Sequence, residues 1–157
     1  MKEMLNKTEQ VSAETDAIIN EIIAPFCSEL HEEMLKIKKL LQREITDKEL
    51  EQSILNLANI LYFTGNGQEM VGIRADISRE EKSEIVGQAI LQGEGSVAEK
   101  TAKAEIMSKK HSLVNDIYTR AYKKLKLKIE SGYEMLNSLK KVLNKRCAEL
   151  ELAKFSK

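Results

Sequence analysis

The last third of the chain contains one long amphipathic run that no proline interrupts. Its apolar positions recur at steps of three and four residues, which is the period of one face of an α-helix. They are Val114, Tyr118, Ala121, Leu125, Ile129, Gly132, Leu136, Leu139, Leu143, Cys147 and Leu150. A helix from Val97 to Leu152 would be roughly 80 Å long at 1.5 Å per residue. Because such a stripe needs a long partner, we expect it to pack on another helix of this chain or on a second subunit.

The composition favours helices throughout. There is 1 proline in 157 residues, with 7 glycines and no tryptophan, and this argues against a sandwich or barrel with many tight turns. We therefore predict an all-α, elongated protein, a coiled-coil-like homo-oligomer in which a long C-terminal helix packs on an N-terminal helical arm. No apolar run spans a membrane and no signal peptide is recognisable, so we expect a cytoplasmic protein without a membrane partner. Cys27 and Cys147 fit free thiols better than a disulfide.

We expect residues 1–157 to form one helical domain with four segments. Residues 1–12 are polar and are expected to be flexible, and residues 13–45 form the N-terminal arm. Residues 46–95 hold short helices and an aromatic–glycine turn, and residues 96–155 form the long basic helix.

Within the arm, Pro25 either kinks the helix or lies in the first turn of a new one. The predicted buried face of the arm follows steps of three and four residues. It consists of Ile18, Ile22, Phe26, Leu30, Met34, Ile37 and Leu41.

Three Ser/Thr-x-x-Glu signatures predict helix starts, because each can form a capping box. They are Thr46–Glu49, Ser78–Glu81 and Ser96–Glu99. We expect the first of these helices to stop at Tyr62–Gly67, with Gly65 in the left-handed conformation, and residues 68–78 to form a loop. Gly93–Gly95 should break the next helix.

The net charge of zero arises because the two halves of the chain carry opposite net charges that cancel. Residues 1–78 carry 8 basic and 14 acidic side chains, whereas residues 79–157 carry 17 basic and 11 acidic ones. Within residues 109–146 there are 11 basic and 3 acidic side chains. This asymmetry indicates a polyanion partner for the basic half, self-association between halves of opposite sign, or both.

The cations of this basic stretch are the candidate nucleic-acid contacts. They are Lys109, Lys110, Arg120, Lys123, Lys124, Lys126, Lys128, Lys140, Lys141, Lys145 and Arg146. A row of cations along a helix attracts phosphates through counterion release, and Tyr118, Tyr122 and Tyr133 could stack on bases. The alternative is a solvated lysine-rich face with tyrosines used for packing.

Residues for enzymatic chemistry are missing from the sequence. His31 and His111 are the only histidines, and neither has a second ligand at metal-binding spacing. The pairs Gly65–Gly67 and Gly93–Gly95 do not follow a buried strand, so they are not phosphate-binding loops. We expect no enzyme and no cofactor.

The run Tyr62-Phe63-Thr64-Gly65 resembles the aromatic-aromatic-Ser/Thr-Gly turn of the phage recombination mediator family, the UvsY type. Glu81-Lys82-Ser83-Glu84 opens a helix at a similar distance downstream, and Arg146 is similar in place to an arginine near the end of the family's long C-terminal helix. The resemblance covers roughly residues 46–155 in order of elements. The alternative for Tyr62 and Phe63 is that they staple the end of a helix into the core.

The resemblance implies a non-enzymatic, ring-like homo-oligomer that binds single-stranded DNA. Such mediators help a RecA-like recombinase to displace single-strand-binding protein. The chain departs from the family because it has no Lys or Arg between Glu49 and Gly65, so Arg74 or the C-terminal cations would have a larger role. The rival hypothesis is a helical structural or interaction protein without DNA binding, such as a phage scaffold, an adaptor or an inhibitor of a host protein.

Overall fold

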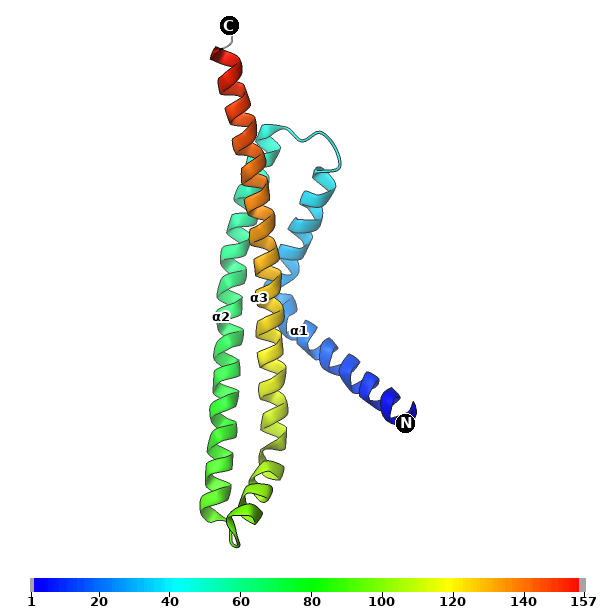
Figure 1. Ribbon diagram of the computed structural model, residues 1–157, viewed down its shortest axis with the longest axis vertical. Helices are drawn as coiled ribbons and strands as arrows, with labels where there is room; N and C mark the ends of the chain where they lie inside the picture. The colour runs from blue at the N-terminus through cyan, green and yellow to red at the C-terminus, as the bar shows by residue number, and fades with distance from the viewer. Residues whose placement is uncertain (1, 156–157) are drawn as a thin grey trace. The chain divides into compact units, whose positions relative to one another are not determined.

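The computed structural model describes the backbone of residues 2–155 and the side chains of residues 9–154. Over this range the chain forms three helices and no strand: α1 (Lys2–Leu40), α2 (Asp47–Gln92) and α3 (Val97–Phe155) (Figure 1). The predicted all-α class is therefore confirmed.

Capping boxes start α2 and α3 as predicted. At α2, the Thr46 amide donates to Glu49 Oε2 over 3.0 Å, and the Glu49 amide donates to Thr46 Oγ1 over 3.3 Å. At α3, Ser96 and Glu99 make the same exchange over 2.8 and 3.4 Å. Just before it, Gly95 has a φ of 109°, a conformation that favours glycine. The chain therefore turns at positions where side chains of a capping box accept hydrogen bonds from the first amides of the next helix.

The turn predicted at Tyr62–Gly67 and the loop predicted over residues 68–78 are wrong, because α2 continues through both. Gly65 is helical, and Ser78 lies inside α2 and not at a helix start. The buried hydroxyls of Thr64 and Ser78 each donate to the carbonyl four residues earlier, over 2.8 Å. A helical glycine costs only about 1 kcal/mol, which packing against neighbouring helices can offset.

The helix α1 begins at Lys2, so it includes residues 2–12, which we expected to be flexible, and it also passes through Pro25. No glycine or proline occurs in residues 2–24 to end a helix. Pro25 lacks an amide hydrogen and removes one helical hydrogen bond. The helix nevertheless continues on both sides of Pro25.

The chain divides into two compact units, and each unit uses parts of all three helices. Unit 1 consists of Met1–Ala24 and Gln68–Lys124, and unit 2 consists of Pro25–Gly67 and Leu125–Lys157.

Unit 2 has a core of large aliphatic side chains. The close approach of its helices depends on Gly132 of α3, where a Cβ would lie 2.7 Å from Leu61 Cδ2 and 3.2 Å from Leu30 Cδ1. The fully buried side chains of this unit are Leu30, Ile37, Leu50, Leu57, Leu61 and Leu125. Here the long C-terminal helix contacts the N-terminal arm, as predicted.

Unit 1 has a smaller interior. Its buried apolar side chains are Ile19 and Ile23 of α1, Val71 of α2, and Ala104 and Ala121 of α3. The Tyr122 ring covers Gly72, where a Cβ would lie 3.2 Å from Tyr122 Cε2. The small residues let α2 and α3 approach closely in this unit.

The predicted buried face of α1 is partly wrong. The buried side chains are Ile19, Ile23, Cys27, Leu30 and Ile37, of which only the last two belong to the predicted face. Apolar residues occur in adjacent pairs along α1, so two neighbouring stripes have the same period. The contacts with the other helices decide which stripe is buried.

We expect Gly65→Ala to stabilise the protein by about 0.5–1 kcal/mol, because Gly65 is helical and has open space around it. Gly67→Ala should instead destabilise it by about 1–3 kcal/mol, since a Cβ there would lie 2.5 Å from Phe26 Cδ1. Urea unfolding followed by circular dichroism measures both effects. Destabilisation by Gly65→Ala would contradict a helix through this segment.

Candidate nucleic-acid interface

In unit 1, four predicted cations share one exposed side of α3. Lys109, Lys110, Arg120 and Lys123 are all exposed, and at 100° per residue they fall within an arc of about 140°. None of them forms an ion pair with a side chain in residues 9–154. Lys124 differs, because its Nζ lies 3.8 Å from Asp16 Oδ1.

In unit 2, the cations of α3 are dispersed. Lys126 lies 3.9 Å from Glu130 and Lys145 lies 3.8 Å from Glu149, so each has a carboxylate on its own helix. The remaining lysines of the predicted set form no ion pair with a described side chain, and their spacing distributes them around the helix. They are Lys128, Lys140 and Lys141. In unit 1 four of the predicted cations therefore share one side of α3, which also carries the exposed carboxylates of Glu105 and Asp116, whereas in unit 2 the cations do not share a side.

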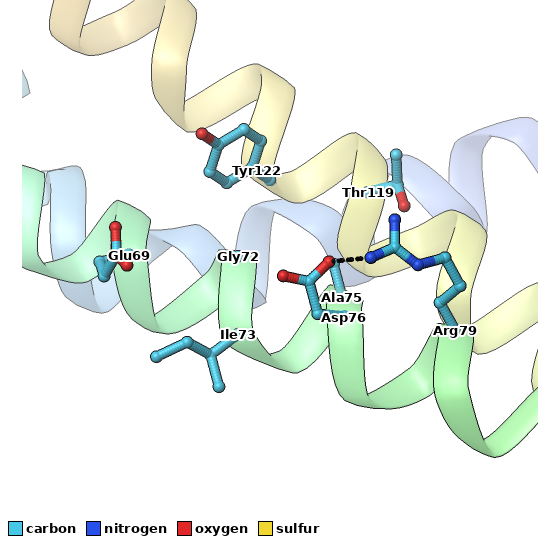
Figure 2. Close-up of a pocket in the computed structure, with 8 residues that line it drawn as sticks. All are labelled: Glu69, Gly72, Ile73, Ala75, Asp76, Arg79, Thr119 and Tyr122. Atoms are coloured by element: carbon cyan, nitrogen blue, oxygen red, sulfur yellow. Dashed lines mark hydrogen bonds and ion pairs between the residues drawn. The ribbon is translucent and has the colours of Figure 1, made fainter.

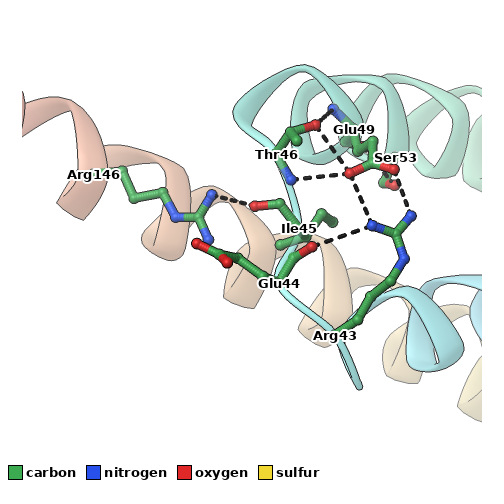
Figure 3. A network of polar contacts seen from close by, with 7 residues as sticks. All are labelled: Arg43, Glu44, Ile45, Thr46, Glu49, Ser53 and Arg146. Atoms are coloured by element: carbon green, nitrogen blue, oxygen red, sulfur yellow. Dashed lines mark hydrogen bonds and ion pairs between the residues drawn. The ribbon is translucent and has the colours of Figure 1, made fainter.

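Arg146 has structural contacts in unit 2 (Figure 3). Its Nη1 donates to the Ile45 carbonyl over 2.7 Å and to Asp47 Oδ1 over 2.8 Å. These bonds join the late part of α3 to the first residue of α2 and the segment before it. The Arg146 side chain is only one-third exposed, so it is less available to a phosphate than the exposed lysines are.

A second arginine reinforces the same capping box (Figure 3). Arg43 Nη2 lies 2.5 Å from Glu49 Oε1, and Glu49 also accepts hydrogen bonds from Thr46. The bond from Arg43, followed by those from Thr46, lowers the pKa of Glu49 to about 2. The bond to Glu49 in turn raises the pKa of Arg43.

Tyr62 and Phe63 lie side by side on the outside of α2 and not in a turn. Each is 67% exposed, and their ring centroids are 5.6 Å apart in an edge-to-face arrangement. The alternative that they staple a helix end into the core is therefore wrong. Two aromatic faces are left open to a planar ligand or an apolar partner.

Sequence reasoning missed a shallow cleft of about 380 Å³ between α2 and α3 in unit 1 (Figure 2). Tyr122 and Thr119 line it from α3, and Asp76 and Arg79 line it from α2, with Arg79 Nη2 2.7 Å from Asp76 Oδ1. We did not predict this cleft because we expected a loop over residues 68–78, and only a continuous α2 places these residues against α3. Arg74, on the same helix, is exposed.

Among residues 9–154 no group of three or more His, Cys, Asp or Glu side chains is arranged to hold a metal ion. None of the described helices has a stretch long and apolar enough to cross a membrane. Comparison with protein-family models, curated proteins and solved structures finds no match to this chain.

The capping box of α2 should make folding sensitive to acid. The pKa of Glu49 is about 2 in the folded protein against an ordinary value of 4.5. Its contribution to stability is therefore fully present above pH 4.5 and is lost as the pH falls towards 2. We expect Glu49→Gln to flatten the decline of the thermal midpoint in this window, measured by circular dichroism.

Glu51→Gln is the matched control, because it removes one carboxylate from the same exposed part of α2 without touching Arg43 or Thr46. A Glu49→Gln variant with the wild-type pH dependence would contradict the role of this box.

Proposed function

We propose that this chain is a single-stranded-DNA-binding recombination mediator that helps to load a RecA-like recombinase in place of single-strand-binding protein. The observation that carries the proposal is a group of four cations on one side of α3 in unit 1 that form no ion pair with the side chains of residues 9–154: Lys109, Lys110, Arg120 and Lys123. The recombinase-loading role rests on the sequence resemblance of Tyr62-Phe63-Thr64-Gly65 to the mediator family, although these residues lie within a continuous helix and not in a turn.

The four cations suit a phosphate backbone. From Lys109 to Lys123 the helix rises about 21 Å, a length that spans several phosphates of a strand. Cations without carboxylate partners gain more from neutralising phosphates, because no existing ion pair must be broken. Such contacts depend on salt and not on base sequence, so a strand held in this way can be passed to a recombinase.

The exposed pair Tyr62 and Phe63 gives a second kind of contact. Bases of a single strand stack on aromatic rings whatever their sequence, and each stack contributes about 1–3 kcal/mol. In a duplex the bases are already stacked, so the pair favours single strands. The two rings would then select the form of DNA that the cations alone do not distinguish.

The rival hypothesis, a structural or interaction protein, also has an observation in its favour. Met70, Ile73 and Ile77 are exposed along one side of α2, and exposed apolar patches mark protein interfaces. A chain that assembles but ignores DNA would favour this rival.

We expect Arg120→Gln/Lys123→Gln to weaken binding of a labelled single strand in fluorescence anisotropy. If both side chains contact phosphates, the slope of log affinity against log salt should fall by about 1.4. Lys38→Gln/Lys39→Gln is the charge-matched control, because both lysines are exposed on α1. Equal losses in the two variants would mean a general charge effect, and no loss in either would remove α3 from the DNA site.

We expect Tyr62→Ser/Phe63→Ser to weaken single-strand binding by about tenfold or more while the salt slope stays unchanged, because stacking releases no counterions. Leu55→Ser is the control, since Leu55 is exposed on the same helix and has no aromatic ring. If the aromatic variant binds as wild type does, the stacking role is wrong.

A further inference from the structure

In unit 1, α3 leaves several of its large apolar side chains on the outside. Ala104 and Ser108 are buried, whereas Ile106, Met107 and Leu113 are exposed. A shallow hollow beside these three side chains is also lined by Lys109 and Lys110. Since large apolar side chains contribute most when they are buried, this arrangement indicates an external partner.

The part of α2 in unit 1 also leaves large apolar side chains on the outside. Val71 and Ser78 are buried, and Met70, Ile73 and Ile77 are on the outside. Together with the three side chains of α3, these are between 49% and 74% exposed. Neither outer surface is therefore covered by the other within one chain.

The two outer surfaces carry opposite charge. Five carboxylates accompany the apolar side chains of α2: Glu69, Asp76, Glu80, Glu81 and Glu84. Four cations accompany those of α3: Lys103, Lys109, Lys110 and Arg120. Charges of the other sign are fewer: Arg74 lies beside the first surface, Arg79 pairs with Asp76 over 2.7 Å, and Asp116 lines the hollow of the second.

The two surfaces also match in length and spacing. Met70 and Ile77 are seven residues apart, as are Ile106 and Leu113, so both pairs of apolar side chains lie two helical turns apart. The charged residues extend over about 23 Å on α2 and about 26 Å on α3. A pair of helices in contact would therefore bring apolar side chains together along the middle and opposite charges along the edges.

We propose that the outer surface of α2 in unit 1, which we call the α2 face, binds the outer surface of α3 in unit 1 of a second copy, the α3 face. The contact joins two different surfaces, so each copy keeps one free α2 face and one free α3 face. Repetition then gives a closed ring or an open filament. This inference does not rest on DNA binding, although Lys109, Lys110 and Arg120 belong to both proposals.

The test uses the apolar positions, which leaves every cation in place. One variant, Ile73→Gln/Ile77→Gln, damages the α2 face and keeps the α3 face. The other, Ile106→Gln/Leu113→Gln, does the reverse. Sedimentation velocity over a wide range of protein concentration, at low and high salt, measures assembly of each variant, of their equimolar mixture and of the wild type.

We expect the wild type to assemble beyond a dimer and to dissociate as salt rises. Each variant alone should self-associate more than about tenfold more weakly. The mixture should form a heterodimer and stop, because one variant offers the intact α3 face and the other the intact α2 face.

Three results would overturn the proposal. They are a wild type that stays monomeric, a mixture that does not combine, and a defect in only one variant, which would mean contact between like faces. Leu55→Gln/Leu127→Gln changes two exposed leucines outside unit 1 and should assemble as the wild type does. Circular dichroism checks that each variant keeps its helices.

Failure of this proposal is distinguishable from failure of the DNA proposal. Anisotropy with the single strand is run on the same samples. Assembly without DNA binding would leave the α2–α3 contact standing, and DNA binding by a monomeric wild type would overturn only the contact.

Discussion

The positions of the three helices depend on where the chain is able to turn. The chain turns at two segments, one before α2 and one before α3. Each has a capping box whose side chain accepts a hydrogen bond from an amide in the first turn of the next helix. The box at Thr46 and Glu49 is the more heavily supported. Arg43 binds its carboxylate, and Arg146 binds the carbonyl of Ile45 beside it. The start of α2 is thereby tied to the late part of α3, nearly a hundred residues away in sequence.

The two units use their helices in different ways. In unit 2, glycines bring the helices together: Gly67 lies under the Phe26 ring, and Gly132 lies against Leu30 and Leu61. Large aliphatic side chains then fill the interior, as in an ordinary helical core. In unit 1 the interior is smaller: Ile19, Ile23 and Val71 are buried together with two alanines, while several other large side chains of α2 and α3 remain outside. The first arrangement supplies stability within one chain, whereas the second leaves apolar surface for a partner.

The proposed functions follow from this difference. Lys123 is exposed and has no carboxylate partner among the described side chains. Arg146, which the sequence placed in the same group of cations, contributes to holding α2 and α3 together in unit 2. Charge counts cannot separate these roles, because both side chains belong to one basic stretch. Only the contacts of each guanidinium or ammonium group show whether it is free to meet a phosphate.

Local chemistry in the sequence was enough to determine the all-α class, the two capping boxes, the break at Gly93–Gly95 and the long C-terminal helix. Capping needs only four consecutive residues, and periodicity needs only one helix, so both can be inferred without knowing the fold. The continuation of α2 through Gly65 and the choice between the Ile18 and Ile19 stripes of α1 were decided by the tertiary structure. At Gly65 the local free energies of a helix and of a turn are similar, and in α1 the two adjacent apolar stripes are similar in hydrophobicity. Packing against the other helices therefore decides both outcomes.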